Sequence, residues 1–138
     1  MFSELEKYQE NGHFFFEKGD NLRLVSKDVP DKPGVYYILR LQKGKIEIVY
    51  IGKSGTMLPN GQFKNQLLKN RVNNKQGGLK RQIFLDLKLE DETIDALDIY
   101  WFVTFDENHK DLPGFVEGVL LQRFYEIYGK LPDWNEGF

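Results

Sequence analysis

GVYYILRLQKGKIEIVYIG, residues 34–52, is the stretch that decides the fold. Side chains alternate in character over residues 35–41 and again over 46–51, which is the two-residue period of a β-strand. The dipeptide Lys43-Gly44 separates the two runs and has the composition of a tight turn. This stretch therefore predicts a β-hairpin.

The rest of the chain predicts helices and further strands around this hairpin. The expected elements are a helix over residues 63–74 that stops near Gly77-Gly78, a second helix over about 79–89, a buried strand over 99–105, and a final helix from Pro113 to about Tyr128, closed by Gly129. The predicted fold class is α+β, with a small central antiparallel sheet, formed by the hairpin and the later strand, flanked by three helices.

The first part of the chain, residues 1–31, predicts a small β appendage of the same domain as residues 32–138. The apolar run Phe14 to Phe16 and the stretch Leu22 to Val25 are its two expected strands, with residues 19–21 as the turn of a hairpin. A length of 138 residues fits one domain.

Composition excludes several classes of protein and of site. Hydrophobic residues make up 41% of the chain and aromatic residues 14%, which is enough to fill a core and argues against disorder. Zero cysteines exclude disulfides and thiolate sites, and two isolated histidines leave carboxylates as the expected ligands of any metal. No run is long enough to span a membrane and no signal peptide begins the chain, so we expect a soluble, cytoplasmic protein.

Charge is segregated along the chain although the net charge is only -2. Residues 40–88 contain 11 basic side chains against Glu47 and Asp86, a local net charge of +9, so the remainder carries -11. A basic middle with acidic arms is typical of a surface that faces a polyanion such as nucleic acid. A solvated, lysine-rich helical surface gives the same pattern, and charge alone leaves both interpretations open.

Two charged residues fall on apolar helix faces. On a helical wheel that starts at Phe63, Arg71 lies in the centre of the apolar face. In the last helix Glu117 lies within a broad apolar face that extends to Ile127 and Tyr128. An unpaired buried charge is costly, so these residues predict either a structural ion pair between two helices or a functional site.

The hairpin resembles the signature of the GIY-YIG nuclease superfamily, because it contains Gly34-Val35-Tyr36 in its first strand and Tyr50-Ile51-Gly52 in its second. In that family a helix with an essential arginine follows, then a helix with a metal-binding glutamate, and near the end an asparagine. This chain supplies Arg71, Glu117 and Asn135 in that order. The resemblance implies a metal-dependent endonuclease that hydrolyses phosphodiester bonds in DNA.

The resemblance also implies the roles of individual residues. Tyr36 would be the general base with Tyr50 beside it, Arg71 would clamp the phosphate, and Glu117 would hold a single Mg²⁺ or Mn²⁺ ion. Lys53 and Arg71 are the cations that would favour the deprotonated tyrosine. These five residues form the expected catalytic set.

Other residues are expected to contact the substrate or to position the site. The expected DNA contacts are Gly52, Lys64, Lys69, Lys80 and Arg81. Gly34 and Asn135 are expected to have positioning roles, although a plain turn role for the asparagine is equally open.

One departure from the family pattern concerns the arginine. Tyr50 and Arg71 are further apart than is usual, and we interpret the Gly55 to Gln62 loop as an insertion before the helix. If the insertion displaces the register, Lys69, Lys64 or Arg81 would have to substitute for Arg71.

The nuclease interpretation has two alternatives. One is a catalytically silent nucleic-acid-binding or interaction domain of the same fold, and the other, which ranks last, is a structural Glu-Arg pair with no nucleic-acid role. The sequence leaves open whether the DNA is duplex, branched or single-stranded, and cutting both strands with one site per chain would favour a homodimer or sequential nicking.

Overall fold

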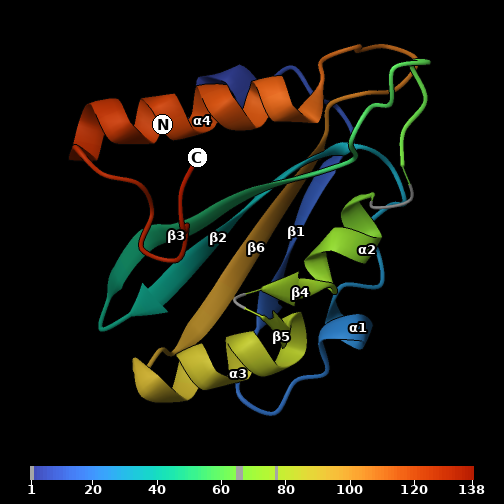
Figure 1. Cartoon of the computed structure of the whole chain (residues 1–138). Coiled ribbons are helices and arrows are strands. Elements are labelled where there is room, and N and C mark those ends of the chain that lie inside the picture. Colours follow the sequence, from blue (N-terminus) through green and yellow to red (C-terminus); the bar gives the residue numbers. More distant parts are fainter. Residues whose placement is uncertain (1, 65–66, 77) are drawn as a thin grey trace.

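The predicted hairpin lies in a four-stranded antiparallel sheet with the order β1-β6-β2-β3, as the computed structural model shows (Figure 1). The strands are β1 (Asn11–Phe16), β2 (Gly34–Gln42), β3 (Lys45–Ser54) and β6 (Ala96–Val103). The structure describes residues 2–64, 67–76 and 78–138. The predicted α+β class and central antiparallel sheet are confirmed.

A two-residue turn, Lys43-Gly44, connects β2 and β3. Lys43 and Gly44 both have positive φ angles, 51° and 74°, as in a two-residue turn whose twist matches that of the strands. The strands pair from this turn to their far ends, with one shift of register between Ile38 and Leu39. At the far ends Tyr36 lies opposite Gly52 and Gly34 opposite Ser54. A Cβ atom at Gly34 would overlap the carbonyl oxygen of Phe102 on β6, so a glycine is required at this position.

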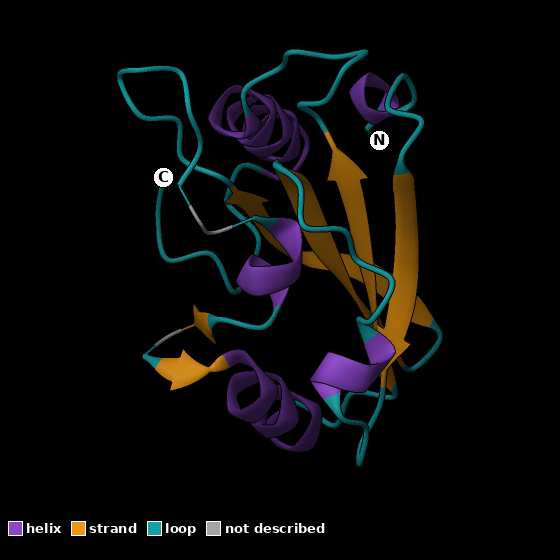
Figure 2. Cartoon of the chain, turned by 90° about the vertical axis from the view of Figure 1, so that its right-hand side faces the viewer, coloured by secondary structure: helices purple, strands orange, loops and turns teal. Residues whose placement is uncertain are grey.

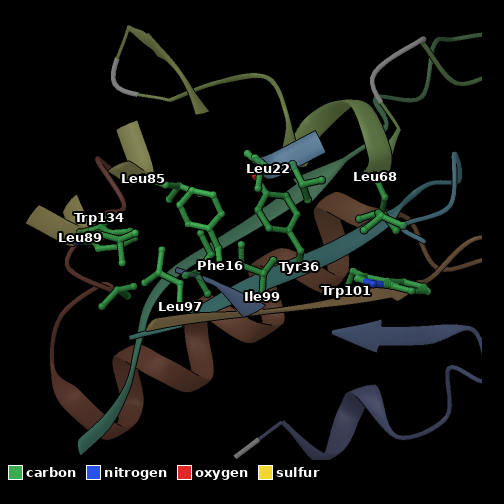
Figure 3. Close-up of a cluster of buried hydrophobic side chains, with 14 of the residues drawn as sticks. Phe16, Leu22, Tyr36, Leu68, Leu85, Leu89, Leu97, Ile99, Trp101 and Trp134 are labelled. Carbon is green, nitrogen blue, oxygen red and sulfur yellow. The ribbon is translucent and has the colours of Figure 1, made fainter. Parts of the chain in front are cut away.

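Helices cover both faces of the sheet (Figures 1 and 2). The helices are α1 (Leu22–Val25), α2 (Leu68–Val72), α3 (Arg81–Asp91) and α4 (Pro113–Tyr128), with a 3-10 turn η1 (Ser3–Leu5) near the start of the chain. Helices α1, α2 and α3 pack on one face, where Tyr36 belongs to the larger core cluster (Figure 3). Helix α4 and η1 pack on the other face over a second, smaller cluster.

The predicted N-terminal hairpin is wrong. Residues 11–16 form β1, which pairs with β6 and so becomes an edge strand of the central sheet, with Phe14 opposite Ile99. Leu22–Val25 is the one-turn helix α1, because Asn21 caps it by accepting a hydrogen bond from the Leu24 amide.

The predicted helix over residues 63–74 is shorter than expected. Phe63 lies in an isolated bridge with Met57 and packs edge-on against Phe105, so it is not part of the helix. Helix α2 begins at Leu68, and residues 65 and 66 of the predicted helix lie outside the described residues.

Two further boundaries differ from the predictions. The strand predicted over 99–105 begins at Ala96 and ends at Val103. The earlier start includes buried Asp98, which is tolerated in the strand because it is paired with His13. The second helix starts at Arg81, after a small unpredicted hairpin of β4 (Lys75–Gln76) and β5 (Leu79–Lys80).

Helix α4 has the predicted bounds. Pro113 occupies the first turn and Gly129, with a φ of 71°, ends the helix in the left-handed conformation. The predicted apolar face ends earlier than expected, since Ile127 and Tyr128 are 57% and 53% exposed. No helix in the described part of the chain is both long and apolar enough to cross a membrane.

Candidate active site

The two motif tyrosines lie side by side at the end of the hairpin. The ring centroids of Tyr36 and Tyr50 are 5.9 Å apart. They approach over Gly52, where an added Cβ atom would lie 2.7 Å from Cζ of Tyr36 and 2.8 Å from Cε1 of Tyr50. Gly52 is therefore a packing requirement of the tyrosine pair.

Substitution of Gly52 by alanine is expected to destabilise the fold by about 1–3 kcal/mol, because buried Tyr36 has to move. Gly114→Ala is the matched control, since its Cβ would meet only Lys53, at an ordinary distance of 3.8 Å, on a helix that favours alanine. Urea denaturation of both variants measures the difference. Equal midpoints for the two variants would show that Gly52 does not set the tyrosine packing.

Arg81 is a buried residue that contacts both tyrosines. Its side chain is only 2% exposed, and its Nη2 donates a hydrogen bond to Oη of Tyr36 at 2.9 Å. Nη1 donates to the side-chain oxygen of Gln76, and Nη2 also reaches the carbonyl oxygen of Arg71 at 3.3 Å. The guanidinium lies 5.5 Å from the Tyr36 ring centroid and 5.4 Å from that of Tyr50.

This placement corrects the expectation that Arg81 contacts DNA from the surface. The sequence contained a signal for it, since Arg81 shares a helical stripe with Leu85 and Leu89, and all three side chains are buried. Arg81 is thus a third charge on an apolar helix face, besides Arg71 and Glu117.

The two tyrosines differ in their access to solvent. Tyr36 is 1% exposed, whereas Tyr50 is partly exposed and lines a cleft of about 430 Å³. Burial raises the pKa of Tyr50 well above its ordinary value, and Tyr36 adds to this while Arg81 opposes it. Tyr50 is therefore protonated at neutral pH, and it is the tyrosine that faces the cleft.

Glu117 lines the same cleft from α4 and is half-buried. Burial raises the pKa of its carboxyl group, and the nearby charges of Lys53 and Arg71 oppose that rise. Among the described residues no side chain forms a hydrogen bond or ion pair with Glu117. One of the two interpretations of these charges is a structural ion pair between Glu117 and Arg71. Within the described part of the chain, Glu117 does not form that ion pair.

Lys53 and Arg71 line a second, smaller pocket. This pocket has a volume of about 40 Å³ and is completed by residues 54–56. Arg81 is the cation that donates a hydrogen bond to the Tyr36 hydroxyl, and its charge opposes the rise in the pKa of Tyr50 more strongly than the charge of Arg71 does. The position of Lys53 and Arg71 beside Glu117 suits two cations that bind phosphate oxygens.

The basic segment does not form one continuous free surface. Arg40 is paired with Glu47, Glu92 and Asp133, and Lys88 lies 3.5 Å from Glu92. The exposed lysines expected to contact DNA lie on the loop before α2, on α2 and on β5, and do not line the cleft: Lys64, Lys69 and Lys80.

Asn135 fixes the segment after α4 to the edge of the sheet. Its side-chain oxygen accepts a hydrogen bond from the Ile51 amide at 3.0 Å, and its side-chain nitrogen donates to the Ile51 carbonyl at 2.9 Å. The Trp134 amide donates to the Val49 carbonyl at 2.8 Å. This segment therefore forms one wall of the cleft beside Tyr50, which is a positioning role for Asn135.

The acidic residues fit a single divalent ion better than a multi-ligand site. The described part of the chain contains no group of three or more His, Cys, Asp or Glu side chains that could hold a metal. Glu117 lines the cleft with a carboxylate to which none of the described side chains hydrogen-bonds, and Mg²⁺ is commonly held by one or two carboxylates and several waters. The residues present thus fit an ion held by Glu117 alone.

Comparison of the chain with protein-family models, with curated proteins and with solved structures found no match. The function proposed below therefore rests on the site geometry and on the sequence motifs.

Proposed function

We propose that the protein is a metal-dependent endonuclease that hydrolyses DNA phosphodiester bonds with a site of the GIY-YIG type. The observation that carries the proposal is the meeting of Tyr50, Glu117 and Asn135 at one cleft, although they come from β3, α4 and the segment after α4. Arg71 and Lys53 act electrostatically on the same glutamate. Five of the residues that the resemblance singles out are thus linked to one cleft or to its glutamate, although they come from distant parts of the chain.

The charges around Glu117 match the requirements of phosphodiester hydrolysis. The phosphate must be held while negative charge develops on its oxygens and on the leaving 3′ oxygen. Arg71 can present two parallel donors to the phosphate, and Lys53 can neutralise a further oxygen as a point charge. A divalent ion held by Glu117 would supply charge neutralisation at the leaving oxygen.

The tyrosine pair would handle the proton of the attacking water. Tyr50 faces the cleft and would orient the water, while Tyr36 lies behind it. Arginine has hydrogen-bond donors only, so Tyr36 Oη accepts from Arg81 and directs its own hydrogen elsewhere. One proton must leave the pair before the pair can accept one from water, and Arg81 is the charge that favours this loss.

This arrangement changes the role expected for Tyr36. A general base must reach the proton that it takes, and Tyr36 is buried. The water-facing position therefore passes to Tyr50, and Tyr36 with Arg81 becomes the group that shares and stabilises the charge.

The proposal is tested with labelled duplex, forked and single-stranded oligonucleotides in Mg²⁺, Mn²⁺ or EDTA. We expect metal-dependent cleavage of at least one of these substrates. Salt-sensitive binding without cleavage of any of them would instead support the silent nucleic-acid-binding domain. Absence of both binding and cleavage would contradict every nucleic-acid function for this site.

A further inference from the structure

We propose that the cleft beside Glu117 binds an unpaired nucleobase next to the phosphodiester that is cut. The proposal rests on the proposed nuclease function and names the class of DNA that the site accepts. It is carried by the aromatic residues that line the cleft, by one buried amide that has no acceptor among the described residues, and by the presence of Tyr50 and Glu117 in the same lining.

Aromatic side chains line the cleft on several sides. Tyr50 lines it, and so do Phe84 of α3 and Trp134, whose rings lie edge-on with centroids 5.9 Å apart. Phe138 is 81% exposed, and its ring rests against Gly118 of α4, where an added Cβ atom would lie only 3.3 Å away. Aromatic rings around a cleft are the usual means by which proteins stack an unpaired base.

Gln76 provides a hydrogen-bond donor in this aromatic surrounding. Its side-chain oxygen is taken by Arg81, and the residue is nine-tenths buried. Its side-chain nitrogen has no acceptor among the described residues, and the residue lines the cleft. A buried donor without a partner is costly, whereas the ring nitrogens and carbonyl oxygens of a base edge are acceptors.

The size of the cleft fits one nucleobase. Its volume of about 430 Å³ lies within the range of pockets for small ligands. Lys88 lies at the cleft 5.4 Å from the Phe84 ring centroid and 5.5 Å from that of Trp134. A base in a duplex is stacked and paired, so only a single-stranded, bulged or flipped base can enter such a pocket.

The test uses oligonucleotides that contain one 2-aminopurine, placed in turn at an unpaired bulge and at a matched position of a duplex. Binding is measured in EDTA, so that no metal-dependent cleavage accompanies it. We expect quenching of the unpaired 2-aminopurine by stacking and no quenching of the matched one. Gln76→Leu and Phe138→Ala should each weaken binding of the bulged DNA by about tenfold, whereas Gln122→Leu, on the exposed side of α4, should not.

Phe138→Ala keeps the test valid if Gln76→Leu perturbs the fold, because Phe138 is exposed. Equal quenching of bulged and matched DNA, or quenching that survives both cleft variants, would overturn the proposal. Cleavage of the same DNA in Mg²⁺ is measured in parallel. Quenching without cleavage would support the base pocket and contradict the nuclease. Cleavage that is unchanged in both cleft variants would support the nuclease and contradict the base pocket.

Discussion

Replacement of Glu117 by glutamine is expected to abolish metal-dependent DNA cleavage and to leave the fold at least as stable as that of the natural protein. Glutamine keeps the shape of the side chain but removes the charge that would hold the ion, so we expect a loss of about 10²-fold or more in cleavage rate. A plasmid-nicking time course measures the loss.

The stability of the metal-free protein provides a second readout for Glu117. Burial raises the pKa of its carboxyl group, which means that the fold disfavours the ionised form. A group with a raised pKa in the folded state contributes stability at low pH that is lost as the pH rises through that pKa. Glu117→Gln should therefore be the more stable protein in urea at pH 7, and the difference should vanish in acid.

Glu126→Gln is the matched control on the same helix. Glu126 is exposed and pairs with Arg123 at 3.2 Å, so its loss should change stability by no more than about 1 kcal/mol and leave cleavage unchanged. Equal loss of cleavage in both variants would show that Glu117 has no special part in the reaction.

Replacement of Arg81 by methionine is expected to cause the largest loss of stability in the site. Methionine fills much of the space but leaves the Tyr36 hydroxyl and the Gln76 side-chain oxygen without the donor that Arg81 provides. Each buried polar group without a partner costs about 1–3 kcal/mol, so the total should be about 2 kcal/mol or more. Urea denaturation measures this change.

Arg123→Met is the control for removing an arginine. Arg123 is half-exposed on α4 and pairs with Glu4 and Glu126 near the surface, where such pairs contribute about 1 kcal/mol or less. A similar small effect for Arg81→Met would contradict the role of Arg81 as the support of the tyrosine pair.

Helices and strands could be predicted from the sequence where the residues that define them are close together in the chain. The hairpin follows from alternation and a two-residue turn, and α4 from Pro113 and Gly129. Glu117 could be identified because α4 is long and regular, so that its helical wheel is accurate over this part. The helical wheel that places Arg71 on an apolar face starts at Phe63, but Phe63 lies before helix α2. The apolar face predicted around Arg71 therefore includes a residue that is not helical.

The remaining features depend on contacts between distant residues. Strand β1 pairs with β6, and nothing near His13 in the sequence reveals that it lies opposite Tyr100. One part of the cleft lining is held by Asn135, which bonds to Ile51, 84 residues earlier in the chain. The buried contact of Arg81 with Tyr36 likewise joins residues 45 apart.

Nicking of supercoiled plasmid by the purified protein, with Mg²⁺ or EDTA and beside Glu117→Gln, tests the central claim most directly. Open-circular product is expected with Mg²⁺ for the natural sequence, and no product is expected with EDTA or with the folded Glu117→Gln protein. Absence of nicking under all conditions, or nicking that persists in Glu117→Gln, would contradict the assignment of this cleft as the active site of a nuclease.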